Sequence, residues 1–350
     1  MRVGIILNPY GEDKPAGLGR SVYEMARAML ELDRENEYLI ILRKKPRTLP
    51  KFTGNNWKIK IADHKYFWID RAIRGEELDV CIFNTPVISF LFRPKKTIVV
   101  TYDYAYDDFG SSRFLKWLNG YALRKADLIF AISEATKRET VRLFGIQEGK
   151  IRIANLGYND ISSISETGVR NLPQKFFFFV GAIKERKNVL GIIQAFAHVR
   201  AKLDEKMVIS GNGSGPYFQK ILDFVRLNNL SGDIIFLGQT SDPELVYLYK
   251  HATALIFPSF IEGFGLPILE AMGCGLPVVT SNVSSLPEVA GDAALLADPY
   301  DPVAIADAMF KISSDERLRN DLIRKGYMQI KKFTWKKSAR DILASLNELD

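Results

Sequence analysis

Residues 258–270 read PSFIEGFGLPILE, and this stretch decides how the rest of the chain is interpreted. The preceding apolar run, Ala254–Phe257, is typical of a buried parallel strand, and residues 268–272 are typical of the start of a helix. A short loop therefore connects a strand to a helix. In open α/β sheets, ligands bind at such strand-to-helix connections.

Two glycines in this loop, Gly263 and Gly265, allow the backbone to approach a ligand closely or to adopt a positive φ. The backbone amides of Phe264, Gly265 and Leu266 would then point from a helix N-terminus toward an anion. The loop is thus expected to bind an anionic group.

Two glutamates flank these glycines and carry a family resemblance. Glu262 and Glu270 have seven residues between them, and this spacing resembles the paired-glutamate motif of the retaining, family 4-like glycosyltransferases. Neighbouring segments look like the same family: 257–259 (FPS), 263–267 (GFGLP), 280–282 (TSN) and 286–289 (LPEV). About forty residues match in order, so the resemblance is specific here, and it extends more thinly to both ends of the chain.

Length and composition favour a soluble globular protein with two domains. The chain has 350 residues, of which 47% are hydrophobic and 25% charged. This is long for a single core and ordinary in polarity. No apolar run approaches the roughly 18 residues that span a bilayer. The N-terminus is too short for a signal peptide, and two isolated cysteines are expected to stay reduced, so we expect a cytoplasmic protein.

The positive charge is unevenly distributed. Residues 1–172 hold 28 basic and 21 acidic residues, whereas residues 173–350 hold 20 of each, so the first half carries the whole net charge of +7. Part of it is clustered at Arg43–Arg47 and Arg93–Lys96. Such clusters suggest anionic partners, with a solvated basic surface as the alternative.

Strand-like and helix-like segments alternate along both halves, which predicts parallel sheets built from βαβ units. A polar segment without periodicity, 162–174, is expected to link the halves. The sequence thus predicts an α/β fold with domains at 1–172 and 173–332. The resemblance implies a GT-B fold, in which two Rossmann-like doubly wound domains face each other across a cleft. It also implies that a final helix, within 333–350, packs back on the first domain.

The turn after the first strand is expected to contact the donor substrate. In the family a Gly-Gly-x-Gly-Arg type loop approaches the donor diphosphate here. Gly17 and Gly19 match it, whereas Ala16 departs from it.

The strand 97–101 is followed by Tyr102 and Asp103. Many members of the family have His-Asp at this place, near the acceptor and the reacting sugar. Asp103 matches, and Tyr102 replaces the histidine. A tyrosine can still donate a hydrogen bond to a sugar hydroxyl. We expect both residues on the acceptor side.

The first strand of the second half ends at Gly181, and the segment 186–188 reads Arg-Lys-Asn. Many members have an arginine directly after the glycine, where this chain has Ala182. Some members, including mannosyltransferases, lack that arginine and keep Arg-Lys-Asn. Arg186 and Lys187 can both reach a diphosphate from a loop, Arg as a bidentate fork and Lys as a point charge.

Two more strand ends in the second half are candidates for donor binding. The segment 210–216 (SGNGSGP) follows a strand and is either a phosphate- or sugar-binding loop, through Gly211, or a plain flexible turn. Gln239 ends a strand that, by resemblance, lies beside the nucleotide base.

The segment 114–122 places Phe114, Trp117, Leu118 and Tyr121 on an apolar stripe between basic residues. A helix at a membrane surface has this pattern. An ordinary helix covering a sheet has it too, and this is the interpretation that we favour.

The resemblance implies transfer of a hexose from a nucleotide-sugar to an acceptor hydroxyl with retention of the anomeric configuration, in polysaccharide or glycolipid synthesis. The Arg-Lys-Asn form favours GDP-mannose over UDP-glucose. Glu262, Lys187 and Arg186 are the expected catalytic residues, and Glu270 is expected to hold the ribose. An epimerase or phosphorylase on the same fold, or a non-catalytic nucleotide-sugar-binding protein, remains an alternative.

The expected partners are a nucleotide-sugar and a saccharide or lipid-linked saccharide acceptor, and no nucleic acid. The basic first half suggests peripheral contact with an anionic membrane, on the inner face. No cofactor or metal is expected, because the chain has no Asp-x-Asp motif and no cluster of metal-ligand type.

Overall fold

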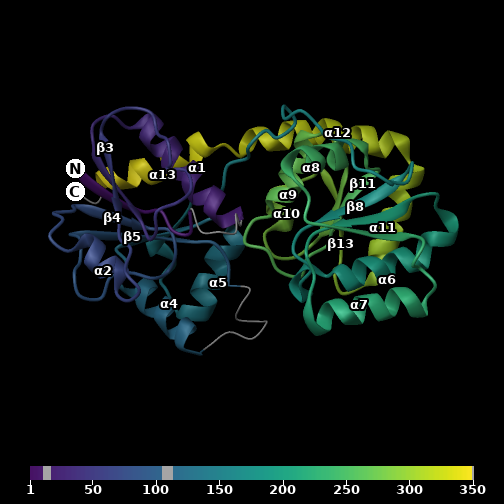
Figure 1. The fold of residues 1–350 in the computed structure, drawn as a ribbon, viewed down its shortest axis with the longest axis horizontal. Coiled ribbons are helices and arrows are strands. Elements are labelled where there is room, and N and C mark those ends of the chain that lie inside the picture. Colours follow the sequence, from purple (N-terminus) through teal and green to yellow (C-terminus); the bar gives the residue numbers. More distant parts are fainter. Residues whose placement is uncertain (11–16, 105–112, 349–350) are drawn as a thin grey trace. The chain divides into compact units, whose positions relative to one another are not determined.

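The computed structural model describes residues 1–10, 17–104 and 113–348, and the chain divides into two compact units (Figure 1). The first unit comprises Met1–Gly157 and Phe333–Asp350, and the second comprises Tyr158–Lys332. Ala16, expected to depart from the glycine-rich turn, lies outside the described residues.

Seven parallel strands form the sheet of the first unit, as far as its residues are described, in the order β3-β2-β1-β4-β5-β6-β7. Strands β1 to β3 extend the sheet in one direction and β4 to β7 extend it in the other, so the sheet is doubly wound with its switch point between β1 and β4. The strands are β1 (Arg2–Ile6), β2 (Glu37–Leu42), β3 (Trp57–Ile61), β4 (Val80–Phe83), β5 (Lys96–Thr101), β6 (Leu128–Ala131) and β7 (Ile151–Ile153).

The described helices of this unit are α1 (Gly17–Leu32), α2 (Trp68–Ile73), α4 (Arg113–Lys125), α5 (Glu134–Phe144), the 3₁₀ turn Glu148–Lys150 and the C-terminal α13 (Trp335–Glu348). Of these, α2, α4 and α5 bury apolar side chains in one core with the sheet. Gly17 and Gly19 form part of the first turn of α1, and not of a loop before it. Within the residues that the structure describes, no helix has the length and apolar composition that crossing a bilayer requires.

The second unit repeats the same winding with six parallel strands, in the order β10-β9-β8-β11-β12-β13. The strands are β8 (Phe176–Val180), β9 (Lys206–Ser210), β10 (Ile234–Gly238), β11 (Ala254–Phe257), β12 (Val278–Ser281) and β13 (Ala294–Ala297). The helices are α6 (Val189–Val199), α7 (Gly215–Leu227), α8 (Asp242–His251), α9 (Leu266–Gly273), α10 (Leu286–Ala290), α11 (Pro302–Ser314) and α12 (Glu316–Gln329), with 3₁₀ turns at Glu185–Lys187, Arg200–Lys202 and Ile330–Lys332.

The central strand β8 shows why this unit folds around a fully covered sheet. Its four phenylalanines, Phe176–Phe179, are all at most 2% exposed. Side chains of a strand alternate between the two faces of its sheet, so both faces of β8 are buried. One ring meets Tyr249 of α8 edge-on, and another stacks on Phe257 of β11.

The boundary between the units differs from the expected one at residue 172. The segment from Tyr158 onward belongs to the second unit, because its side chains and backbone contact α8 and α9. The Tyr158 hydroxyl lies only 1.8 Å from the point where a Cβ on Gly273 would stand. Further on, the amide of Thr167 donates to the carbonyl of Pro243 at 3.1 Å. The polar sequence of this segment has no pattern that predicts these contacts.

Helix α13 packs against α1 within the first unit. One face of it is fully buried and consists of Ala339, Ile342 and Leu346. At its polar edge, Lys336 forms an ion pair with Glu31 of α1 at 2.7 Å. The first unit is therefore built from both ends of the chain.

The carboxyl ends of β8 and β9 approach each other so closely that glycine is required. Gly181 and Gly211 have φ values of +141° and +147°. A Cβ on Gly211 would lie 1.9 Å from the carbonyl oxygen of Gly181. Both the backbone conformation and the lack of space exclude a side chain here.

We expect Gly211→Ala to destabilise the protein by about 2 kcal/mol or more, because the backbone of β8 must move to admit a methyl group. Urea unfolding of the whole chain measures the effect through the transition of the second unit. Gly232→Ala is the matched control, since its Cβ would meet no atom within 4 Å and its φ lies outside the left-handed region. We expect it to change stability by less than about 0.5 kcal/mol. Equal effects of the two substitutions would contradict this account of the strand ends.

Candidate active site

The candidate site lies at the carboxyl edge of the second sheet, where the strand order turns back between β8 and β11. Two loops meet there. One follows β8 and includes the 3₁₀ turn Glu185–Lys187, and the other joins β11 to α9. Ligands of doubly wound sheets bind at this switch point. The topology therefore brings together two sequence segments that are about 75 residues apart.

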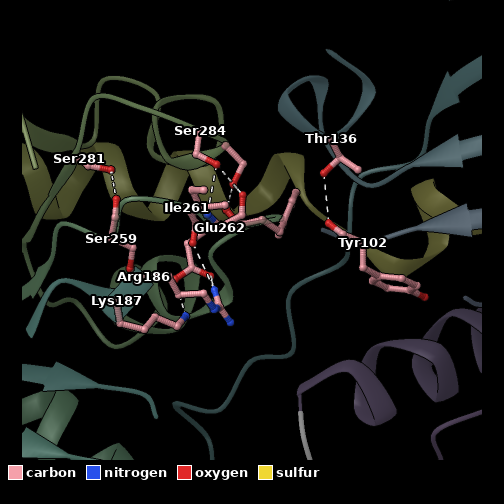
Figure 2. A network of polar contacts seen from close by, with 11 residues as sticks. Tyr102, Thr136, Arg186, Lys187, Ser259, Ile261, Glu262, Ser281 and Ser284 are labelled. Carbon is pink, nitrogen blue, oxygen red and sulfur yellow. Dashed lines mark hydrogen bonds and ion pairs between the residues drawn. The ribbon is translucent and has the colours of Figure 1, made fainter. Parts of the chain in front are cut away.

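The centre of the site is the carboxylate of Glu262, which two basic side chains approach from the other loop (Figure 2). The ammonium of Lys187 donates to Oε1 of Glu262 in a short contact. The guanidinium of Arg186 lies 3.4 Å from Oε2 and also donates to the carbonyl of Ile261 at 3.2 Å. The structure thus unites the three expected catalytic residues in one charged cluster.

This cluster is largely removed from water. The side chains of Lys187 and Glu262 are only 12% and 9% exposed. The ammonium of Lys187 also lies 5.0 Å from the centre of the buried Phe257 ring, which adds a cation–π attraction. Opposite charges at low exposure interact more strongly than they do on a surface, but removing either partner leaves the other uncompensated.

The charge balance favours an ionised Glu262. Burial of its carboxyl group raises the pKa, but the charges of Lys187 and Arg186 outweigh this and hold the pKa below its ordinary value of 4.5. A lowered carboxyl pKa stabilises the fold above pH 4.5, and this stabilisation is lost as the pH falls through the folded-state value. Glu262 is therefore an anion at neutral pH.

Buried and half-buried polar side chains fix the shape of the loop that carries Glu262. The hydroxyl of Ser284 donates to the carbonyl of Glu262 at 2.7 Å and accepts its amide at 3.1 Å. The buried hydroxyl of Ser285 reaches the carbonyls of Glu262 and Phe264, at 2.9 and 2.8 Å. Asn188 spans to the carbonyls of Pro258 and Pro299, at 3.2 and 2.7 Å. The carboxylate is thus held by a preorganised backbone.

Helix α9 begins at Leu266, directly after this loop, and its N-cap is Gly265 with φ +112°. A Cβ there would lie 2.7 Å from the Leu286 side chain, so conformation and space both require glycine. Gly263 and Phe264 complete the turn, and Phe264 is buried. The helix N-terminus favours an anion at the same edge of the sheet as Arg186 and Lys187.

Glu270 lies on α9 and has a different set of neighbours from Glu262. The hydroxyl of Tyr249 on α8 donates to Oε2 of Glu270 at 3.0 Å. Tyr249 is fully buried, and burial, followed by the charge of Glu270, raises the pKa of its hydroxyl well above the ordinary value. The hydroxyl of Tyr249 therefore stays protonated and donates its hydrogen bond to Glu270, which orients the carboxylate.

Three further expected donor residues lie at the ends of β8, β9 and β10. Gly181 and Gly211 form the close approach described above, and Gly238, with φ +70°, precedes Gln239. The amide of Gly211 donates to the carbonyl of Gly238 at 2.7 Å. The side chain of Gln239 accepts from Asn212 at 3.4 Å. These loops extend the edge that carries Glu262.

The expected acceptor-side residues belong to the first unit, as do Gly17 and Gly19. Tyr102 follows β5, and its hydroxyl donates to Oδ1 of the buried Asn84 at 3.4 Å. Burial raises the pKa of Tyr102 above its ordinary value, so its hydroxyl stays protonated. Asp103 is half-buried beside it.

Several residues that support these sites were not predicted from the sequence. They are Ser284, Ser285 and Tyr249, which hold Glu262 and Glu270 by hydrogen bonds although they are distant from them in sequence. Only Asn84 could have been predicted from its place in the sequence, because a polar residue directly after an apolar strand, here β4, is a candidate site residue. No group of three or more His, Cys, Asp or Glu side chains, among those the structure describes, is placed to hold a metal ion.

Sequence profiles of two families match consecutive parts of the chain. The family described as "Glycosyl transferases group 1" matches residues 160–329, and "Glycosyltransferase Family 4" matches residues 15–160. The two matched regions meet close to the boundary between the two units.

Relatives with named activities include two from Escherichia coli. The O-antigen chain mannosyltransferase B is 35% identical over 225 residues, which are 61% of this chain and 58% of the relative. The serotype-specific mannosyltransferase WbdA is 32% identical over 227 residues, which are 61% of this chain and 28% of the relative. The match thus spans little more than half of the first relative and about a quarter of the second.

Solved structures share the fold over the whole chain. Anabaena HepE in complex with UDP and glucose has a TM-score of 0.78 at 15% identity and covers 99% of both chains. Sucrose-phosphate synthase from Thermosynechococcus elongatus has a TM-score of 0.76 at 18% identity and covers 100% of this chain and 99% of its own. The expected class, an α/β fold of two Rossmann-like domains of the GT-B type, is confirmed.

The paired glutamates, the Arg-Lys-Asn turn and the two profile matches agree along the sequence. The chain belongs to the family 4-like, group 1 glycosyltransferases.

Proposed function

We propose that this protein transfers a mannosyl residue from GDP-mannose to a hydroxyl of a saccharide or lipid-linked saccharide acceptor, with retention of the anomeric configuration. The observation that carries this proposal is the buried cluster of Lys187, Arg186 and Glu262 at the switch point of the second sheet. A protein that only binds a nucleotide-sugar has no need to stabilise a departing diphosphate, as these two cations would.

The leaving group of such a reaction is a nucleoside diphosphate, whose negative charge grows as the glycosidic bond breaks. Arg186 and Lys187 offer fixed positive charge there, and the N-terminus of α9 adds backbone donors. Preorganised charges of this kind stabilise a transition state because they need not reorient during the reaction. With these groups in place, we propose that the enzyme needs no metal ion.

The two glutamates are proposed to act on different parts of the donor. Glu262, an anion buried between two cations, would hold the hydroxyls of the sugar or stabilise positive charge at its anomeric carbon. Glu270, oriented by Tyr249, would accept hydrogen bonds from the ribose hydroxyls. Phe264, Gly265 and Leu266 lie between them in sequence.

In the proposed reaction, the bond between the anomeric carbon and the diphosphate oxygen breaks while the acceptor oxygen bonds to the same face of that carbon. The acceptor proton passes to an oxygen of the departing phosphate. Atoms and charge then balance without a further reagent.

The choice of mannose is supported by two observations. Ala182 replaces the arginine that many members have after Gly181, and Arg186-Lys187-Asn188 matches the form found among mannosyltransferases. Two relatives at 35% and 32% identity are named mannosyltransferases. Turnover with a panel of GDP-mannose, UDP-glucose, UDP-galactose and UDP-N-acetylglucosamine tests this choice, and faster turnover of a UDP-sugar would overturn it.

We expect Lys187→Ala to lower kcat by a factor that corresponds to roughly 2–4 kcal/mol of lost transition-state stabilisation. The ammonium faces charge that develops on the leaving group. Steady-state kinetics measure the effect, and Lys184→Ala, an exposed residue of the same loop, is the control. Kinetics within about threefold of wild type would remove Lys187 from the site.

Lys187→Ala also leaves Glu262 with less compensation, so stability falls as well. The double variant Lys187→Ala/Glu262→Gln isolates the effect on stability, because a neutral amide no longer needs the ammonium, whereas its turnover also reflects the loss of Glu262. We expect it to recover stability relative to Lys187→Ala without recovering turnover. Recovery of both would mean that Lys187 acts only through the fold.

We expect Tyr249→Phe to raise the KM for the donor by about tenfold with little change in kcat, since a hydrogen bond to a charged group contributes about 1.5–3 kcal/mol. Tyr247→Phe, on the same helix, is the control and should leave KM unchanged. If Glu270 holds the ribose, a 2′-deoxyribose donor should be less affected by Tyr249→Phe than the natural donor is. Equal effects on both donors would contradict the role of Glu270.

We expect activity to survive treatment with EDTA, because fixed cations neutralise the leaving group in this proposal. Turnover is measured before and after chelation, with Mg²⁺ and Mn²⁺ added back. Loss of turnover on chelation and its return with either ion would contradict the assignment of this role to Arg186 and Lys187.

A further inference from the structure

Four aromatic rings of the first unit stack in a continuous row along its surface. Phe114, Trp117 and Tyr121 of α4 stack in turn, with ring centres 6.0 and 5.9 Å apart. The row continues to Phe90 in the β4–β5 connection, whose ring centre lies 5.3 Å from that of Tyr121. We call these four residues the aromatic stack.

The aromatic stack is not needed to cover the sheet. Helix α4 already buries another face, formed by Asn119, Gly120, Ala122 and Leu123. The expectation that α4 covers the sheet is met by that face alone. The opposite side leaves Phe114 67% and Trp117 57% exposed, and Leu91, next to Phe90, is 70% exposed. Neighbouring large apolar side chains at this exposure mark a surface that meets something apolar.

The two segments that carry the aromatic stack are basic in sequence, although one of their lysines, Lys95, is paired with Asp79 at 2.7 Å. Residues 90–96 and 113–125 together contain seven basic and no acidic residues. Arg113, Arg124 and Lys125 are exposed at the two ends of α4. Arg93 donates to the hydroxyl of Tyr121 at 2.8 Å, which ties the basic loop to the row of rings. The surface therefore combines apolar rings with a basic surround.

We infer that the aromatic stack and its basic surround form a docking surface for an anionic lipid bilayer. Aromatic side chains settle at the boundary between headgroups and acyl chains, and surrounding Lys and Arg side chains meet the lipid phosphates. This inference is independent of the sugar transferred and of the roles of Arg186, Lys187 and Glu262.

A second basic cluster of the first unit has less exposed apolar surface beside it, with Leu49 at 44% exposed. Arg43, Lys44, Lys45 and Arg47 follow β2, and Pro46 between them is buried. Such a cluster attracts an anionic surface mainly through charge, which salt screens within a Debye length. Apolar contacts are not screened by salt, so we expect binding of the aromatic stack to anionic vesicles to persist in part at higher salt.

The test uses the full-length protein and sedimentation with two kinds of vesicle, phosphatidylcholine alone and phosphatidylcholine containing phosphatidylglycerol. We expect binding to the second kind, with a blue shift of tryptophan fluorescence as Trp117 enters the interface. Wild-type protein that stays in the supernatant with anionic vesicles at low salt would overturn the inference.

The variant Phe114→Ser/Trp117→Ser removes apolar surface without changing net charge, and we expect about a tenfold loss of binding to anionic vesicles. Its matched control is Leu227→Ser/Met328→Ser in the second unit, where the two side chains are 79% and 58% exposed. The control should bind as wild type does. Because all four side chains are exposed, the variants should fold, and their thermal transitions check this.

The basic surround is tested by Arg113→Gln/Arg124→Gln/Lys125→Gln. Near an anionic bilayer each charge contributes on the order of 1 kcal/mol, so we expect the three substitutions to weaken binding by about a hundredfold. The control, Arg43→Gln/Lys44→Gln/Lys45→Gln, removes the same charge and should lose less. A larger loss in the control would place the contact elsewhere and overturn the inference.

Two further measurements separate the possible outcomes. Turnover of a soluble acceptor should be unchanged in Phe114→Ser/Trp117→Ser, whereas Lys187→Ala should bind vesicles normally, so failure of the proposed function and failure of this inference are distinguishable. If the wild type forms dimers that Phe114→Ser/Trp117→Ser abolishes, and neither protein binds vesicles, the surface joins two copies of this chain and the inference is wrong.

Discussion

The contact between Lys187 and Glu262 is the constraint on which the site of the second unit depends. Two opposite charges at low exposure are stable only while both are present and correctly placed. Asn188 joins the two loops, and Ser284 and Ser285 hold the backbone of Glu262 in place from the connection between β12 and α10. The arrangement uses buried hydrogen bonds to keep charges ready for a ligand that is itself charged. In a site of this kind, folding already provides the free energy that orients the charged groups, so little reorientation is needed during the reaction.

The fold was largely predictable because its signals are local. A run such as Phe176–Phe179, with Gly181 two residues beyond it, is typical of a strand covered on both faces. The boundary between the units was not predictable in the same way. Tyr158 joins the second unit through its fit against Gly273, and Thr167 joins through one backbone hydrogen bond. Contacts of this sort depend on where two distant segments come together, and a polar sequence carries no trace of them.

The candidate site was predictable in its charged residues but not in its supports. Glu262, Arg186 and Lys187 stand in motifs whose chemistry is evident, and the structure brings them together. Ser284 and Tyr249 stand in no recognisable motif. Their role is evident only in the structure, where they donate hydrogen bonds to Glu262 and Glu270, respectively. The orienting residues of a site are generally of this kind, because a helix or loop of almost any sequence can carry a single hydroxyl.

The distribution of charge also has a structural meaning that composition alone could not give. The net charge of the whole chain is +7, and residues 90–96 and 113–125 hold seven basic and no acidic side chains. Part of the basic surplus therefore lies around four stacked rings on one surface of the first unit. Some basic side chains elsewhere in that unit meet acidic ones, as Arg2 and Lys60 meet Glu76, whereas residues 43–47 form a second basic cluster. A merely solubilising charge would have no reason to gather beside exposed aromatic rings, since each ring lowers the solubility that the charge provides.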